Sequence, residues 1–165
     1  MAMRKCVIVV CLLVLGITLS AAQEKISSQW KCEGKPADQH SIAVPDHEGH
    51  SYSIAQGKCI AEKGSMGDAK EQEGTFTEFG DMTSSGVQNH GVFVDTLASG
   101  DKIFYHYHGT QSWKDGKMES GNNKWTLAGG TGKFKAVKGE GGCQGKGNPD
   151  GSSTWNCEGT YSVAK

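Results

Sequence analysis

The sequence has few of the basic groups that mark nucleic-acid-binding proteins. It contains a single arginine, Arg4, which lies close to the N-terminus. Beyond residue 22 the chain has 15 lysines against 18 acidic residues, a net charge of −3. Without guanidinium groups this part of the chain lacks the best bidentate clamp for phosphate. We therefore expect no nucleic-acid partner, because proteins that bind nucleic acids carry a basic surface.

Helical periodicity and the spacings of common catalytic and zinc motifs are also missing. Beyond residue 22, apolar residues do not recur at helical spacing over any long window. The sequence has no G-x-S-x-G nucleophile elbow and no CxxC or CxxH pair. The stretch "GGTGK" at 129–133 lacks the serine or threonine that follows the lysine of a phosphate-binding loop, and predicts a tight turn. These patterns therefore leave any catalytic residues unknown, and we predict no cofactor.

The longest apolar run lies at the N-terminus, between Val7 and Leu19. Two basic residues precede it and a Ser-Ala-Ala stretch follows, as in a secretory signal peptide. The run is too short to span a bilayer comfortably. We expect residues 1–22 to be cleaved, leaving residues 23–165 as a single secreted or periplasmic domain with no membrane segment.

The rest of the chain consists of short β-rich runs bounded by Gly, Asp, Asn and Ser. Stretches such as "KDGK" at 114–117 and "NPDGS" at 148–152 are typical of hairpin turns. A long loop is expected between residues 35 and 49. We expect eight strands, near 26–33, 50–61, 72–79, 86–97, 102–110, 118–128, 134–143 and 153–162.

A short internal repeat indicates how these strands close. "WKCEG" at 30–34 recurs as "WNCEG" at 155–159, in the first and last expected strands. First and last strands are neighbours in a closed eight-stranded antiparallel barrel, which is the fold class we predict. Period-two alternation then places each Trp/Cys face toward the interior.

Four cysteines lie beyond residue 22, and an even number in an exported chain predicts two disulfides rather than a zinc site. Three pairings are open from the sequence alone. If neighbouring strands supply each partner, the bonds are Cys32–Cys59 and Cys143–Cys157.

The stretch "KIFYHYHGT" at 102–110 carries two histidines between aromatic residues. An even-length turn centred on Ser99-Gly100 would make Leu97 face Lys102, whereas an odd-length turn would exchange the faces of one strand. The even-length register places an almost wholly apolar set inside: Val92, Val94, Ile103, Tyr105 and Tyr107. It turns His106 and His108 outward, beside a patch of Phe93, Leu97 and Phe104 that we hypothesise contacts another subunit.

A second group of histidines lies in "DHEGH" at 46–50, with His40 upstream. Zinc and copper sites usually draw three or four ligands onto a rigid scaffold. The sequence therefore favours a polar loop at the barrel mouth over a metal site, and we predict no bound metal.

One segment resembles a known family. "LAGGTGKFKAVKGEG" at 127–141 is similar to the G-G-T-G-x-F-x-x-x-x-G stretch of allene oxide cyclase-like and dirigent barrels. "GDKIFYHYHGT" at 100–110 resembles the strand that precedes it, although Lys135 stands where the dirigent motif often has arginine. The likeness covers roughly the second half of the chain. As a whole, the sequence is similar to small exported bacterial proteins of this superfamily.

The resemblance implies an eight-stranded antiparallel barrel with an apolar cavity, often assembled as a trimer. Family members bind oxidised fatty-acid derivatives or direct the coupling of phenoxy radicals. Their acidic catalytic positions lie outside the matching segment, so the resemblance transfers no mechanism to individual residues of this chain.

We expect a binding module for a small apolar or aromatic ligand. The alternatives are a cofactor-independent cyclase or isomerase acting on a lipid-derived or phenolic substrate, and a ligand-free structural protein of the envelope. An eight-stranded barrel can also be filled by its own side chains. The residues expected to line the cavity are Val92, Val94, Tyr105, Tyr107, Trp125 and Phe134.

Overall fold

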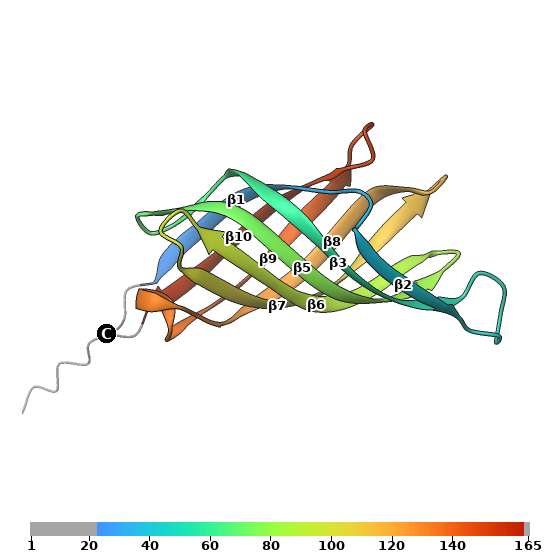
Figure 1. The fold of residues 1–165 in the computed structure, drawn as a ribbon, viewed down its shortest axis with the longest axis horizontal. Helices are drawn as coiled ribbons and strands as arrows, with labels where there is room; N and C mark the ends of the chain where they lie inside the picture. The colour runs from blue at the N-terminus through green and yellow to red at the C-terminus, as the bar shows by residue number, and fades with distance from the viewer. Residues whose placement is uncertain (1–22, 164–165) are drawn as a thin grey trace, which may run out of the picture.

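The computed structural model describes residues 23–163, most of which lie in antiparallel strands (Figure 1). The expected signal peptide, residues 1–22, lies outside the described residues. Within 23–163, no helix is long and apolar enough to cross a membrane. The elements are β1 (Glu24–Cys32), β2 (Asp38–Ala43), β3 (Ser51–Lys63), β4 (Ser65–Met66), β5 (Ala69–Thr83), β6 (Gly86–Leu97), β7 (Lys102–Lys114), β8 (Lys117–Gly130), the 3-10 turn η1 (Gly132–Phe134), β9 (Val137–Gly147) and β10 (Ser153–Val163).

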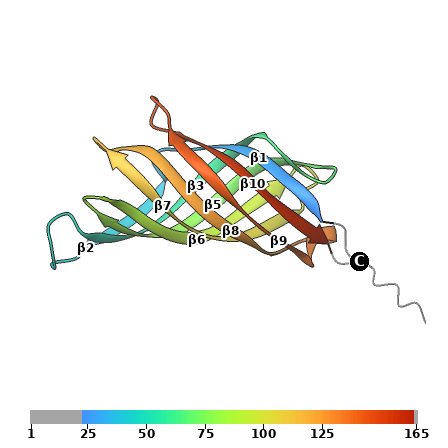
Figure 2. The ribbon, with the colours of Figure 1, turned by 180° about the vertical axis from the view of Figure 1, so that it is seen from behind.

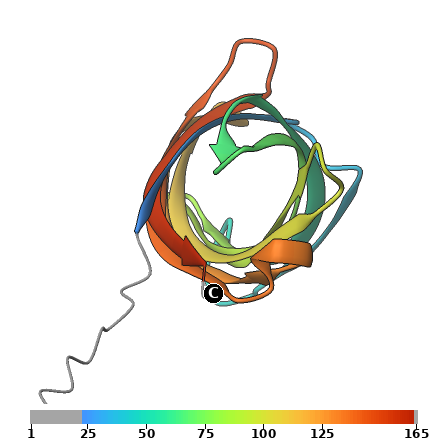
Figure 3. The same cartoon turned by 90° about the vertical axis from the view of Figure 1, so that its left-hand side faces the viewer.

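Eight strands close into a barrel. The neighbours around the wall are β1, β10, β9, β8, β7, β6, β5 and β3, and β3 pairs with β1 to complete the ring. Figure 3 looks into the ring, and Figure 2 shows the wall from behind. All these pairings are antiparallel. The predicted fold class, an all-β eight-stranded closed barrel, is confirmed.

The eight expected strands correspond to the eight barrel strands, but β2 and β4 were not expected. β2 lies within the predicted long loop and pairs with Ser51–Gln56 of β3, beyond the stretch that pairs with β1. All six residues of β2 are exposed, so no alternation of apolar and polar residues marks it in the sequence. The position of β2 is instead fixed by backbone hydrogen bonds to the edge of β3 that β1 leaves free.

One end of the barrel is filled by a packed core. This is the end where β1 begins and where η1 folds over the rim between β8 and β9 (Figure 3). Lys133 of η1 forms an ion pair with Asp68, next to the start of β5. The buried apolar side chains here are Ile26, Met66, Leu97, Ile103, Tyr105, Trp125, Phe134, Val137 and Tyr161.

The hairpin between β6 and β7 differs by one residue from the expected register. Thr96, not Leu97, faces Lys102, so the connection has the odd length of five residues. Inside it the Leu97 amide donates to the Asp101 carbonyl at 2.9 Å, and the Gly100 amide donates to the Leu97 carbonyl at 2.8 Å. Because a one-residue slip exchanges the faces of a strand, every side chain of β6 points opposite to the expectation.

The face of β7 was predicted correctly and that of β6 was not. Ile103 and Tyr105 are buried, whereas His106 and His108 are exposed on the outer wall. The expected outer patch of Phe93, Leu97 and Phe104 is wrong, because Leu97 is 1% exposed and Phe93 packs against Trp30 inside the barrel.

Candidate functional site

The half of the barrel opposite η1 contains a cavity of about 160 Å³. Its deep end reaches Ile26 and Glu71, near the packed core. At the other end it is lined by the exposed residues Glu33, Gly34 and Gly151. The cavity therefore opens at the rim formed by the β7–β8 and β9–β10 turns.

Eight aromatic side chains line the cavity, including all four tryptophans of the chain. Edge-to-face pairs fix several of the rings, with centroids 4.9 Å apart for Trp30 and Phe93 and 5.4 Å apart for Tyr105 and Trp125. The aromatic lining residues are Trp30, Phe76, Phe93, Tyr105, Tyr107, Trp113, Trp125 and Trp155.

Inward-facing glycines let two of the tryptophans lie flat against the wall. A Cβ atom on Gly141 would come within 2.2 Å of the Trp125 ring, and one on Gly159 within 2.5 Å. Trp155 lies in the same way over Gly121 and Gly145, where an added Cβ would come within 2.6 and 2.7 Å of the ring. These distances are shorter than any real contact, so the glycines are needed for the ring positions.

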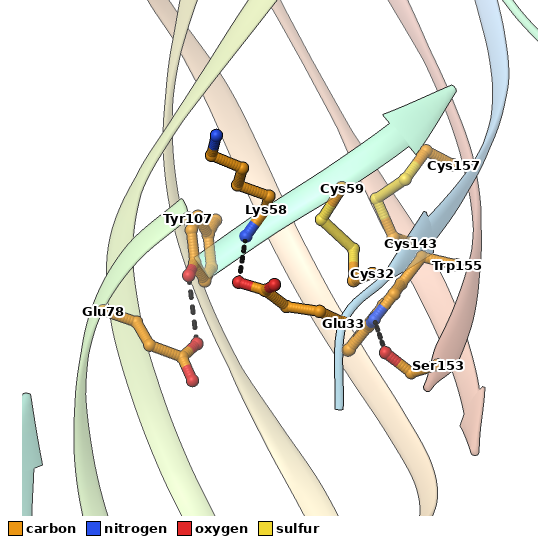
Figure 4. Close-up of a disulfide and its surroundings, with 10 residues drawn as sticks. All are labelled: Cys32, Glu33, Lys58, Cys59, Glu78, Tyr107, Cys143, Ser153, Trp155 and Cys157. Carbon is orange, nitrogen blue, oxygen red and sulfur yellow. Dashed lines mark hydrogen bonds between the residues drawn. A yellow bond between two sulfur atoms is a disulfide. The ribbon is translucent and has the colours of Figure 1, made fainter. Parts of the chain in front are cut away.

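Two disulfides lie in the same wall (Figure 4). Cys32 faces Cys59 across β1 and β3, and Cys143 faces Cys157 across β9 and β10. Both pairs are bonded, with Cα atoms 4.0 Å apart, as predicted. Next to Cys32, the Glu33 carboxylate turns to the mouth and accepts a hydrogen bond from the Lys58 amide at 2.7 Å.

A polar cluster interrupts the aromatic wall midway along the cavity. The Tyr107 hydroxyl donates to Glu78 Oε2 at 3.0 Å (Figure 4), and the Asn89 amide donates to the same oxygen at 2.9 Å. Burial raises the pKa of Glu78, while the hydrogen bonds from Tyr107 and Asn89 act to lower it. The remaining oxygen of Asn89, Oδ1, is buried and has no hydrogen-bond partner.

Two more carboxyl groups lie at the deep end, where the cavity meets the packed core. Glu71 is 1% exposed, and its Oε1 accepts a hydrogen bond from Ser28 at 2.8 Å. Asp95 is fully buried behind it, and neither of its carboxyl oxygens has a partner. Burial raises the pKa of Glu71 to about 7. Burial, and then the charge of Glu71, raise the pKa of Asp95 to about 8. Both groups are thus able to hold a proton near neutral pH.

The structure brings together three of the six residues expected to line the cavity. Tyr105, Tyr107 and Trp125 line it. Phe134 is buried in the packed core at the η1 end instead. Val92 and Val94 lie on the outer wall as a result of the register of the β6–β7 hairpin, and Val92 is 38% exposed.

The inward carboxyl groups were missed by sequence reasoning. The one-residue slip in β6 hid Asp95, which appeared to face solvent. In β5 a bulge between Glu71 and Glu73 changes the side-chain parity, so Glu71 and Glu78 both face the interior although one number is odd and the other even. The sequence of β5 carries no distinct signal of this bulge.

Among residues 23–163, one group of side chains has the spacing of metal ligands, and it lies outside the cavity. It consists of Asp46, His47 and His50 in the loop between β2 and β3.

Comparison with known proteins supports the fold. No family model and no curated protein matches the chain. Among solved structures, the pterocarpan synthase dirigent protein GePTS1 is similar, with a TM-score of 0.51 and 11% identity, covering 98% of this chain and 100% of its own. A second pterocarpan synthase dirigent protein, PsPTS1, has a TM-score of 0.47 and 13% identity, covering 87% and 97%.

The protein is thus a closed antiparallel barrel with an internal cavity open at one end. More specifically, its fold is that of a dirigent-like barrel, as the residues at 127–141 indicated. At 11% identity the likeness establishes the fold alone.

Proposed function

We propose that the barrel binds a small aromatic molecule that carries hydroxyl groups. The cavity volume supports one ring, because an engineered protein cavity of about 150 Å³ accepts benzene. The mouth at the β7–β8 and β9–β10 turns leaves room for substituents of the ligand to extend outward. Aromatic walls with a few polar groups are typical of small-molecule sites.

The observation that carries this proposal is a set of hydrogen-bond acceptors without partners in the aromatic wall. Asn89 Oδ1 and Asn123 Oδ1 are buried and unpaired, and both residues line the cavity. A buried acceptor without a partner costs about 1–3 kcal/mol. A ligand hydroxyl supplies the missing donor, which a plain hydrocarbon cannot do.

The proposal is tested by titrating the protein with phenol, catechol and toluene while following tryptophan fluorescence. Phenol and catechol are expected to change the emission at lower concentration than toluene. Replacing Asn123, an inward residue of β8, by Leu should weaken phenol binding about tenfold while sparing toluene. Asn122→Leu, its outward neighbour, is the matched control and should change neither titration. Equal affinity for phenol and toluene would contradict the proposal.

A second candidate function is acid–base catalysis on such a ligand, without a cofactor. The specific observation behind it is Glu71, which lines the cavity and has a pKa of about 7. A carboxyl group with that pKa can both give and take a proton near neutral pH, as isomerisation or cyclisation of a phenolic or lipid-derived substrate requires. Asp95 behind it would influence its protonation.

Glu71→Gln separates this candidate from simple binding. The variant keeps the size of the side chain and is expected to retain phenol binding. If the protein is an enzyme, the variant loses turnover, measured as altered ligand mass after incubation with candidate substrates. Turnover that survives in Glu71→Gln would remove Glu71 from the catalytic role.

We also propose that the protein acts in a secreted or periplasmic setting, because two disulfides persist best in an oxidising compartment. Homo-oligomerisation, which the family resemblance implies, remains a proposal as well. Mass spectrometry of the mature protein under non-reducing conditions tests export, through the N-terminus and the disulfides. Sedimentation at several concentrations tests assembly. An N-terminus other than Gln23 would revise the cleavage site, and a monomer at every concentration would refute assembly.

A further inference from the structure

The loop between β2 and β3 gathers two imidazoles and a carboxylate outside the cavity. The Val44 amide donates to the His50 carbonyl at 2.9 Å, and Gly49 has a φ of +78°, which favours glycine. The loop therefore closes on itself, and the side chains of Asp46, His47 and His50 meet on one side of it. In Figure 1 it projects beyond β2 at the right-hand end of the molecule.

The distances within this group suit a single metal ion. Asp46 Oδ1 lies 2.6 Å from His50 Nδ1 and 3.1 Å from His47 Nδ1. All three ligand atoms lie within 4.8 Å of one another. A tetrahedral ion with bonds of about 2.0–2.1 Å holds its ligand atoms about 3.3 Å apart. Displacements of the ligand atoms by about 1 Å therefore allow all three to bind one ion.

His50 is already fixed in the way that a ligand histidine usually is. It is 9% exposed, and its second ring nitrogen, Nε2, lies 3.1 Å from Asp81 Oδ1 of β5. Histidines that bind metals commonly donate this other N–H to a carboxylate, which fixes the tautomer and the ring orientation. The ring also stacks on His47 at a centroid distance of 4.6 Å and meets the edge of Tyr52 at 5.1 Å.

The other two groups are open to solvent. The side chains of Asp46 and His47 are each 53% exposed, so an ion can reach them and keep water in its remaining position. Two imidazoles with one carboxylate favour a transition metal such as zinc over magnesium or calcium, which prefer oxygen ligands.

We propose that Asp46, His47 and His50 bind one divalent transition-metal ion, represented by Zn²⁺, with Asp81 as a positioning residue. The site is independent of the ligand cavity and of the proposed function. Its effect is to fasten the β2–β3 loop, through His50 and Asp81, to the barrel wall at β5. Sequence reasoning favoured a polar loop without a metal at 46–50. It did not reveal Asp81, which the fold brings from 31 residues beyond His50.

Calorimetric titration of the untagged protein with Zn²⁺, after treatment with a chelator, tests the proposal. We expect saturable uptake of one ion per chain and an affinity at least about tenfold lower in His47→Ala. This variant removes a half-exposed ring, so folding should be preserved. His40→Ala, which removes an exposed histidine of β2, is the control and should bind as the parent does. A flat titration of the parent overturns the proposal.

The role of Asp81 and the identity of the ligands need two further readouts. Asp81→Asn should lower the Zn²⁺ affinity about 10–100-fold, while its thermal stability in chelator stays that of the parent. Ring-nitrogen NMR signals of His47 and His50 should shift on Zn²⁺ addition, and those of His106 should not. Shifts confined to His90 and His108, which face each other on the outer wall, would overturn the assignment.

Discussion

Side chains alternate between inside and outside in both halves of the barrel, but one half is packed solid and the other contains a cavity. Near η1 the inward residues are large, and Met66, Leu97, Ile103 and Phe134 are at most 2% exposed. In the other half, inward glycines replace side chains and the aromatic rings lie against the wall, leaving a cavity of about 160 Å³. The comparison shows that residue size at inward positions, rather than strand number, decides whether such a barrel is solid or open.

The carboxyl groups lie at the boundary between these halves. Glu71 faces the cavity, and Asp95 lies behind it among the packed residues. Burying them weakens the fold, because each carboxyl group is held away from water with few or no hydrogen-bond partners. The position of Glu71 at the floor of the cavity is what the proposed binding of a polar ligand group, or the proposed proton transfer, requires.

Truncating one aromatic residue in each half should give the largest contrast. Phe134→Ala leaves a void in the packed end and should cost about 3–5 kcal/mol of unfolding free energy. Trp113→Ala at the cavity mouth, where the side chain is 41% exposed, should cost less than about 1.5 kcal/mol. Urea unfolding measures both variants, and equal losses would mean that the two ends are packed alike.

Removing a disulfide from the open half should cost nearly as much, because each bond restricts the unfolded chain. Replacing Cys32 and Cys59 together by Ser releases a link across 27 residues, for which chain entropy predicts about 3.5 kcal/mol. The Cys143–Cys157 pair, which spans 14 residues, should cost about 3 kcal/mol. Unfolding of both double variants is compared with that of Phe134→Ala. A loss below about 1 kcal/mol would show that the aromatic wall holds this half unaided.

The boundary carboxyl groups should make the stability fall as the pH rises. Asp95 ionises near pH 3.8 when unfolded, but its pKa in the folded protein is about 8. The contribution of neutral Asp95 to the unfolding free energy is fully present below pH 3.8. It falls by up to about 1.4 kcal/mol per pH unit and is lost by about pH 8. Asp95→Asn should flatten this slope between pH 4.5 and 6.5 in urea unfolding series. Asp38→Asn on the exposed β2 should not, and an unchanged slope in Asp95→Asn would contradict the assignment.

The smallest expected effect tests the corrected register of β6. Val92 faces outward, so Val92→Ala should change the unfolding free energy by less than about 0.5 kcal/mol. Phe93→Ala, which removes an inward ring next to Trp30, should cost about 3 kcal/mol or more. The reverse order would restore the register expected from an even-length turn.

Much of the barrel could be predicted from local patterns. The repeated Trp-x-Cys stretches predicted that β1 and β10 are neighbours, and Trp30 does face Trp155. They also led to both disulfides. These predictions succeeded because cysteine and tryptophan are rarely placed outward on a barrel strand, so their alternation fixes the face.

The candidate site was less predictable, because it depends on single-residue shifts. The connection between Thr96 and Lys102 has five residues, whereas a four-residue connection between Leu97 and Lys102 was expected. This difference was enough to exchange the faces of β6 and to hide Asp95. The bulge after Glu71 had the same effect in β5. Neither shift has a distinct composition, since polar residues with glycine suit turns of either length.

The measurement that tests the central claim most directly is NMR of the four tryptophan indole N–H groups and the Asn89 and Asn123 amides during a phenol titration. All six groups belong to residues that line the cavity. We predict saturable shifts of the Trp125, Trp155 and Asn89 signals, with the amide of Asn122 on the outer wall unchanged. Phenol-induced shifts confined to outer-wall residues, or none at saturating phenol, would contradict the account.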